Sequence, residues 1–124
     1  MGKNLKILNI NASRINRKDR LINLLYTIKA LGPNVICIQE INIREAYNTF
    51  KDSYECIING NTNMGDGIGI ITMVEKGIIV KEKIIGECGR IIGVKVENIQ
   101  VWNVYPISGA GNKQKRELFF RGNW

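Results

Sequence analysis

Four polar side chains close to the ends of strand-like segments could act together on a phosphate group. Glu40 ends the apolar run that begins at Val35, Asn9 and Asn11 close the first alternating segment, and Tyr105 ends the last one. Because ligands gather where strands of an α/β sheet end, these side chains are expected to lie near one another. A carboxylate can hold Mg²⁺, which prefers oxygen ligands. Amides can orient a phosphate or a water, and a phenol can donate a hydrogen bond to a phosphate oxygen.

Each of these residues also has a structural interpretation that the sequence leaves open. A glutamate at a strand end can simply reach solvent, and an asparagine there is commonly a turn residue. Tyr105 precedes Pro106 and could be an interfacial aromatic with a hydrated hydroxyl. The positions of these residues do not by themselves show whether they form a functional site or are ordinary residues at strand ends.

The amino-acid composition limits which catalytic groups the protein can use and which partners it is expected to bind. The chain has no histidine, which excludes a Ser-His-Asp triad, a histidine metal ligand and a histidine general base. Eighteen Lys and Arg residues against eleven Asp and Glu residues give a net charge of +7. This balance favours polyanionic partners through counterion release. DNA or RNA is therefore the favoured partner, and a generic basic surface is the alternative.

Two basic segments follow predicted strand ends and could reach a nucleic-acid backbone. The first is the heptapeptide Arg14-Ile15-Asn16-Arg17-Lys18-Asp19-Arg20, and the second is Lys113-Gln114-Lys115-Arg116. Basic residues on helix faces are also ordinary solvated surface, so contact with a phosphate backbone is one of two open interpretations.

Length and apolar content fit one domain or part of one. The chain has 124 residues, of which 44% are apolar, as is ordinary for a globular core. No window approaches the roughly 18 uninterrupted apolar residues of a membrane helix. Polar alternation follows Lys3 and Lys6 in place of an apolar signal region. We expect an intracellular protein, nuclear or cytoplasmic, that is not secreted and has no membrane partner; the sequence does not indicate an oligomeric state.

Three cysteines occur, Cys37, Cys56 and Cys88, without a C-x-x-C pair. Their odd number and their position in or beside apolar strand-like runs predict buried, reduced thiols.

Hydrophobic periodicity predicts the elements that must position the polar residues. Apolar residues on one stripe predict a helix over Arg17–Leu31, with Asn16 as its N-cap and Gly32-Pro33 as its end. A short helix is expected over 43–50, and a basic helix begins at Lys113. The predicted strands are Leu5–Asn11, Val35–Glu40, Tyr54–Asn59, Gly67–Val74, Ile78–Gly86, Arg90–Glu97 and Gln100–Tyr105.

The glycine-rich segment Gly65-Asp66-Gly67-Ile68-Gly69 resembles a phosphate-binding loop only loosely. Ile70 stands where the third glycine of G-x-G-x-x-G should be. We interpret this segment as a loop that enters a strand with close backbone packing.

The element order predicts an α/β fold in which helices flank a mixed β-sheet. The sequence shows no second layer for the other face of that sheet, and an uncovered apolar face is an aggregation hazard. We therefore expect half of a layered α/β sandwich.

Four segments in order resemble the endonuclease/exonuclease/phosphatase superfamily. They are Leu8-Asn9-Ile10-Asn11, Ile38-Gln39-Glu40, Gly67-Ile68-Gly69-Ile70 and Asn103-Val104-Tyr105-Pro106. The Asn-Ile-Asn motif and the stretch from Ser108-Gly109 to Lys115-Arg116-Glu117-Leu118-Phe119-Phe120 are most similar to the apurinic-type endonuclease domain of non-LTR (LINE-type) retrotransposons. The resemblance covers nearly the whole chain and implies a DNase I-like fold.

The resemblance implies hydrolysis of a phosphodiester with Mg²⁺ or Mn²⁺, nicking one strand of DNA. It also implies a reverse transcriptase domain as a partner in the parent polyprotein. By position, it makes Asn9, Glu40 and Tyr105 catalytic, with Glu40 and Asn11 as metal ligands. We also predict that Asn11, Arg14, Ser108, Lys115 and Arg116 bind the substrate.

The chain also departs from the pattern of the superfamily. Ala12 stands where glycine is usual, and Pro106-Ile107-Ser108 replaces the common Ala-Pro-Asn. The Gly-Asp-x-Asn and Ser/Thr-Asp-His motifs of the second half are absent. We therefore expect residues 1–124 to form a single partial domain, truncated on its C-terminal side. Two alternatives remain: a non-catalytic nucleic-acid-binding remnant, and a phosphatase of the same superfamily.

Overall fold

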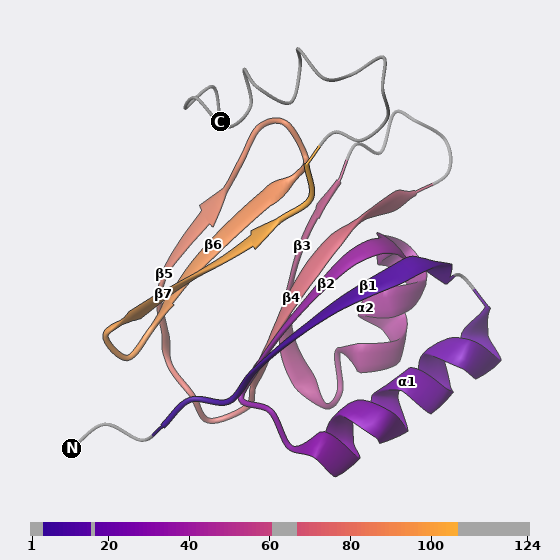
Figure 1. The fold of residues 1–124 in the computed structure, drawn as a ribbon, viewed down its shortest axis with the longest axis horizontal. Helices are drawn as coiled ribbons and strands as arrows, with labels where there is room; N and C mark the ends of the chain where they lie inside the picture. Colours follow the sequence, from indigo (N-terminus) through magenta and orange to yellow (C-terminus); the bar gives the residue numbers. More distant parts are fainter. Residues whose placement is uncertain (1–3, 16, 61–66, 107–124) are drawn as a thin grey trace.

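Two helices and two β-sheets form three layers in the computed structural model, which describes residues 4–15, 17–60 and 67–106 (Figure 1). The α/β class and the order of the elements agree with the prediction. The elements are β1 (Ile7–Ile15), α1 (Lys18–Leu31), β2 (Val35–Asn42), α2 (Ile43–Phe50), β3 (Tyr54–Gly60), β4 (Ile68–Glu75), β5 (Val80–Ile85), β6 (Ile91–Val96) and β7 (Ile99–Val104).

The strands divide between two sheets. The larger sheet has the order β1-β2-β4-β3, in which β1 and β2 are parallel and the other neighbours are antiparallel. The smaller sheet is an antiparallel meander with the order β5-β6-β7. The parallel pairing of β1 and β2 places the ends of both strands at one edge, as the sequence predicted.

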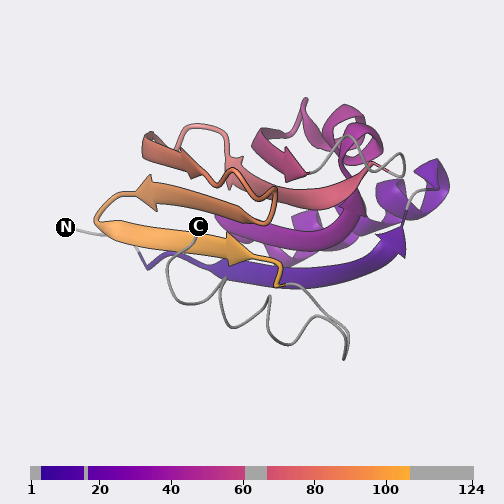
Figure 2. The same ribbon diagram turned by 90° about the horizontal axis from the view of Figure 1, so that it is seen from above.

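The larger sheet is covered on both of its faces. Both helices lie against one face, where Leu21, Ile28 and Phe50 pack on apolar residues of β2 and β4. The smaller sheet covers the opposite face (Figure 2). Val94, Val101 and Cys37 belong to the core cluster between the two sheets. The prediction that the sequence supplies no second layer was therefore wrong, because β5, β6 and β7 form that layer themselves.

The helix α1 begins one residue later than predicted. Its N-cap is Arg17, whose side chain makes no capping hydrogen bond, so the prediction of Asn16 as the N-cap was wrong. Gly32 ends the helix in the left-handed conformation (φ 66°), and its N–H donates to the carbonyl of Ile28. This C-terminal stop was predicted from the Gly-Pro pair. The second helix has the bounds that the sequence predicted, and Asn42 caps it by accepting a hydrogen bond from the N–H of Glu45.

Strand ends differ from the prediction by up to four residues. The first strand runs on past Asn11 to Ile15, and the second runs past Glu40 to Asn42. The last strand ends at Val104, directly before Tyr105. The basic helix predicted from Lys113 lies outside the described residues.

Close packing at Gly69 confirms the structural interpretation of the glycine-rich segment for its described part. A Cβ atom at Gly69 would lie 2.4 Å from the carbonyl oxygen of Asn59 on the neighbouring strand. Only a glycine allows the two strands to approach this closely.

The described cysteines are free thiols, in agreement with the prediction. Cys37 is buried, Cys56 is partly buried and Cys88 is exposed, so the prediction that all three are buried was wrong. Within residues 4–15, 17–60 and 67–106, no helix has the length and apolar character needed to cross a membrane.

Candidate functional site

A β-bulge at Glu40 determines the direction of its side chain. Gln39 pairs with Ile70 and Ile41 pairs with Gly69, so two steps along β2 match one step along β4. Glu40 is the extra residue, and its φ of 58° lies in the left-handed region. Bulges are common near active sites, where they redirect a side chain. A non-glycine residue with positive φ costs on the order of 1–2 kcal/mol, which other contacts must offset.

The bulge moves the carboxylate from one face of the sheet to the other. Along β2, Ile36 and Ile38 pack on the helix side, whereas Val35 and Cys37 pack on the side of the smaller sheet. Strict alternation would place the next helix-side position at Glu40, inside an apolar core. Instead, Ile41 occupies the helix-side core, and Glu40 reaches the smaller sheet.

Glu40 meets Tyr105 at the junction of the two sheets. The Tyr105 hydroxyl donates a hydrogen bond of 3.0 Å to Oε1 of Glu40. Both side chains are half-buried. The sequence predicted that these residues share one site, and the structure brings them into contact.

Arg90 holds Tyr105 from its other side. The guanidinium carbon lies 5.1 Å from the centroid of the Tyr105 ring, within the range of a cation–π contact. Nη1 of Arg90 also donates to the carbonyl oxygens of Tyr105 (3.1 Å) and Pro106 (3.4 Å). In return, the backbone N–H of Tyr105 donates to the carbonyl oxygen of Arg90 (2.9 Å). Main-chain and side-chain contacts therefore both fix Tyr105.

The side-chain amide of Gln39 connects the first strand to the last through hydrogen bonds to two other amides, those of Asn9 and Asn103. Nε2 of Gln39 donates to Oδ1 of Asn9 (2.6 Å) and to Oδ1 of Asn103 (2.9 Å). Gln39 and Asn103 are buried, with 7% and 1% of their surfaces exposed, whereas Asn9 is exposed. The chain of hydrogen bonds leads from the interior to an exposed amide beside the strand that carries Glu40.

Asn11 lies in β1 opposite Gln39 and is exposed. Its Oδ1 accepts a hydrogen bond from the backbone N–H of Ser13 (2.9 Å), and Ser13 has a φ of 52°. This local turn matches the structural interpretation of a strand asparagine. A carbonyl oxygen has two lone pairs, so the contact leaves Oδ1 able to bind a cation as well.

The structure thus brings together only part of the predicted site. Glu40 and Tyr105 are in contact. Asn9 is hydrogen-bonded to Gln39, the residue before Glu40. Asn11 is paired with Gln39 across the two strands. The strand position of Arg14 is described but its side chain is not. The other predicted substrate-binding residues, Ser108, Lys115 and Arg116, lie outside the described residues.

Sequence reasoning missed three residues of this site: Gln39, Asn103 and Arg90. Gln39 had a detectable signal, because it is a polar residue at the end of a continuous apolar strand and buried amides require partners. Asn103 lay in a recognised motif without a role. Nothing in the sequence around Arg90 distinguishes it from the other basic residues.

A divalent cation fits these residues in part. Among the described residues, no group of three or more His, Cys, Asp and Glu side chains could hold a metal. Mg²⁺, however, keeps several waters and is commonly bound by one or two carboxylates together with substrate phosphates. Glu40 would be the carboxylate ligand here, and Asn11 could add an amide oxygen. When bound, the cation would neutralise charge on a phosphate.

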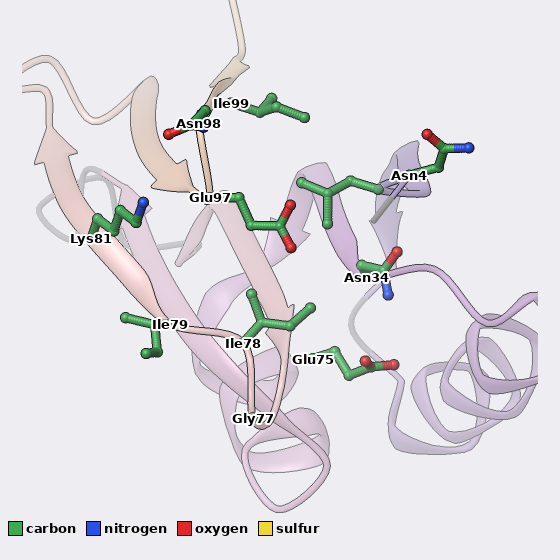
Figure 3. A pocket seen from close by; sticks show the side chains of 11 residues that line it. Asn4, Asn34, Glu75, Gly77, Ile78, Ile79, Lys81, Glu97, Asn98 and Ile99 are labelled. Atoms are coloured by element: carbon green, nitrogen blue, oxygen red, sulfur yellow. The ribbon is translucent and has the colours of Figure 1, made fainter. Parts of the chain in front are cut away.

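A cavity of about 720 Å³ lies at the opposite end of the sandwich and is not part of this site. It is lined by residues just before β1 and β2, by the segment from the end of β4 into β5 and by the hairpin between β6 and β7. Figure 3 shows Asn4 and Asn34 on one side of it and Ile79 and Lys81 on the other. Since β2 runs from this cavity to Glu40, the length of the strand separates the two places.

Comparisons with known proteins identify the fold. No protein-family model matches the chain, and no curated protein matches it in sequence. Solved structures do match. A 3′-5′ exonuclease (NExo) from Neisseria meningitidis superposes with a TM-score of 0.74 at 18% identity, covering 94% of this chain and 49% of that one.

Two further structures support the same assignment. A NExo structure from Neisseria, described as a 3′ phosphatase bound to product DNA hairpin, gives a TM-score of 0.73 at 16% identity and covers 95% of this chain and 49% of that one. Humanized TDP2 from D. rerio gives 0.71 at 19% identity, covering 94% and 53%.

These proteins are members of the endonuclease/exonuclease/phosphatase superfamily, which has the DNase I-like fold. The chain therefore has a DNase I-like α/β fold, as the sequence predicted. It spans about half the length of the solved structures that it matches.

Proposed function

We propose that the chain carries one side of a metal-dependent phosphodiester-hydrolysing site that acts on DNA. The observation that supports this most directly is the bulge that turns Glu40 out of the helix-side core and into contact with Tyr105. A strained backbone within a buried strand, which presents a carboxylate beside a phenol and an exposed amide, is typical of functional sites.

The roles follow from the chemistry of each group. Glu40 binds the divalent cation, Mg²⁺ or Mn²⁺, and Asn11 contributes an amide oxygen to it. Asn9 and Tyr105 bind oxygens of the scissile phosphate. Arg14, Ser108, Lys115 and Arg116 bind the DNA backbone, in keeping with the net charge of +7. The similarity to NExo, a 3′ phosphatase bound to a product DNA hairpin in one structure and a 3′-5′ exonuclease in the other, supports DNA as the substrate.

The finer assignment is a DNA-nicking endonuclease of a non-LTR retrotransposon, with a reverse transcriptase in the same polyprotein. It rests on the Asn-Ile-Asn motif at Asn9–Asn11 and on the ordered motifs through Tyr105. Nicking of supercoiled plasmid, as opposed to digestion from ends, would distinguish an endonuclease from an exonuclease.

Metal binding by the chain is the first test, because it does not require a complete active site. We expect Mn²⁺ to broaden the NMR signals of residues around Glu40 in the ¹⁵N-labelled protein. Glu40→Gln should remove this broadening, while Glu82→Gln on the exposed strand β5 should leave it unchanged. Equal broadening in the Glu40→Gln variant would refute the assignment of Glu40 as a metal ligand.

A non-catalytic DNA-binding protein is the second candidate, and the net charge is the observation that favours it. In that case DNA binding would weaken with salt as expected for phosphate contacts. Glu40→Gln would then leave DNA binding unchanged or strengthen it in the presence and in the absence of Mg²⁺. A Mg²⁺-dependent loss of DNA affinity in Glu40→Gln would instead support the hydrolytic site.

A further inference from the structure

We infer that Gln39 and Asn103 are positioning residues that fix the orientation of the Asn9 side-chain amide, so that its NH₂ group faces the site and donates to an oxyanion. The direction of three successive hydrogen bonds carries this inference. The oxyanion that we assign is a phosphate oxygen, and this part of the inference rests on the proposed function.

The chain of hydrogen bonds begins at main-chain carbonyls. Nδ2 of Asn103 donates to the carbonyl oxygen of Ile71 (2.9 Å) and to Oγ1 of Thr72 (3.2 Å). A second carbonyl oxygen, that of Ile38, lies 3.4 Å away. A carbonyl oxygen can only accept a hydrogen bond. The Asn103 amide must therefore turn its nitrogen toward these oxygens, and its own Oδ1 faces the other way.

The orientation of Asn103 determines that of Gln39. Because Oδ1 of Asn103 is an acceptor, the group that approaches it to 2.9 Å has to be the NH₂ of Gln39. The second N–H of the same NH₂ group points at Asn9, 2.6 Å from Oδ1. Reversing the Gln39 amide would place oxygen against oxygen at a buried position, where an unmade hydrogen bond is costly.

Asn9 is the exposed end of this chain of hydrogen bonds, in which Gln39 donates both to Asn103 and to Asn9. Its Oδ1 is the acceptor for Gln39, so its Nδ2 with two N–H donors is the part that remains for a ligand. Within the described residues, no contact from Nδ2 of Asn9 is found. A pair of N–H donors suits a phosphate oxygen and does not suit a cation. Asn9 is thereby distinguished from Glu40, which offers only acceptors when ionised.

A structural role alone would explain the buried part of the chain, since Gln39 and Asn103 join the two sheets. It would not require that Nδ2 of Asn9 bind a ligand. Protection of individual side-chain amide protons from exchange with water therefore tests the orientation of the amides, and the binding of an oxyanion at Asn9 tests the positioning role.

The experiment is hydrogen exchange of assigned side-chain NH₂ signals in the ¹⁵N-labelled 124-residue protein, without ligand. We expect slow exchange for the NH₂ protons of Asn103 and Gln39 and fast exchange for those of Asn9. Slow exchange at Asn9 with fast exchange at Gln39 would mean that the amides point the opposite way, and it would overturn the inference. This readout stands even if Glu40 binds no metal.

Titration with inorganic phosphate tests the ligand. We expect the NH₂ signals of Asn9 to shift, and Gln39→Met to weaken the apparent phosphate affinity roughly fivefold, the weight of about one hydrogen bond. The same substitution at Gln100, an exposed residue of β7, is the matched control and should leave the affinity unchanged. No shift at Asn9 in saturating phosphate would refute the oxyanion assignment.

Asn9→Asp provides a second variant in case Gln39→Met does not fold. The aspartate keeps an oxygen for Gln39 but replaces the two N–H donors with a negative charge. We expect the Gln39 NH₂ protons to remain slow and phosphate binding to be lost. Retention of phosphate binding in Asn9→Asp would overturn the role of Nδ2.

Discussion

The hydroxyl of Tyr105 donates to Oε1 of Glu40 at 3.0 Å, although the two residues are 65 positions apart in the sequence. One residue follows the last strand of the smaller sheet, and the other is the bulged residue of the larger sheet. The hydrogen bond therefore joins the sheets at the edge where the candidate site lies. It also restrains the carboxylate that we propose as a metal ligand.

Removal of this hydroxyl should affect metal binding more than stability. We expect Tyr105→Phe to lower the free energy of unfolding by about 1 kcal/mol, because the hydrogen bond is half-buried. Mn²⁺ affinity should fall about tenfold, the usual effect of losing a group that orients a metal ligand. Urea unfolding and Mn²⁺ titration measure the two quantities. Tyr47→Phe, at an exposed tyrosine of α2, is the control, and an equal loss of affinity in it would contradict the role of Tyr105.

The backbone at Glu40 leads to an unusual order of stability among its variants. Glycine in a strand is normally less stable than alanine, but glycine adopts positive φ without strain. Since φ of Glu40 is 58°, we expect Glu40→Gly to be more stable than Glu40→Ala by about 1 kcal/mol. Both variants lack the carboxylate, so the comparison isolates the backbone. The reverse order in thermal or urea unfolding would show that residue 40 has ordinary strand geometry.

Arg90 contributes to the site through the shape of its guanidinium as well as its charge. Lysine at this position would keep the charge but lose the planar contact with Tyr105 and the paired carbonyl contacts. We expect Arg90→Lys to lower the free energy of unfolding by about 1 kcal/mol and to shift the ring-proton signals of Tyr105. Lys95→Arg on β6, the strand that follows Arg90, is the control. An unchanged Tyr105 spectrum in Arg90→Lys would rule out the stacking contact.

Close contact between β3 and β4 makes Gly69 intolerant of a side chain. A Cβ there would lie 2.4 Å from the carbonyl oxygen of Asn59, whereas at Gly60 the closest atom would be 3.2 Å away. We expect Gly69→Ala to cost at least about 2 kcal/mol and Gly60→Ala clearly less. Because Gly69 pairs with Ile41 next to the bulge, the Gly69 variant should also weaken Mn²⁺ binding. Equal stability of the two variants would contradict the close approach.

Burial of two cysteines should make stability fall at alkaline pH. Burial raises the pKa of Cys37 to about 11 and that of Cys56 to about 12, from 9.0. Below pH 9 the thiols are protonated in both states. Above it the unfolded chain loses protons that the folded chain keeps, so the free energy of unfolding falls as pH rises towards 11 and 12. Urea unfolding from pH 8 to 11 measures this. The slope should decrease in Cys37→Ala, and an unchanged slope there would contradict the shift at Cys37.

Local elements were predictable because they follow from periodicity. Apolar spacing and the Gly32-Pro33 pair were sufficient for α1, and both ends of α2 were correct. A helix between two strands is typical of parallel pairing, which the structure shows for β1 and β2. These inferences need only neighbouring residues in the sequence.

The division into two sheets could not be predicted in the same way. Which strands pair is determined by long-range contacts, and nothing in the residues of β5 assigns that strand to one sheet or the other. Exposed Ile84 and Ile85 in β5 resemble buried strand residues when only the sequence is considered.

The site was predictable at Glu40 and Tyr105, which lie close to the ends of β2 and β7, but not in its supporting contacts. The partners of Gln39 come from β1 and β7, 30 and 64 positions away. A bulge leaves no mark in the composition of a strand, because it changes pairing and not residue type. The orientation of the Glu40 side chain therefore depends on the β-bulge, which could not be predicted from the sequence.

The extra residue in β2 makes the site sensitive to chain length. Loss of one residue between Ile38 and Ile41 would restore strict alternation along the strand. Deletion of Glu40 would remove the carboxylate, and deletion of Gln39 would remove the amide that donates to Asn9 and Asn103. In either case Ile41 would keep its place in the helix-side core, so the deletion would damage the site more than the fold. In homologous sequences, gaps should therefore avoid these four positions even where the side chains around them vary.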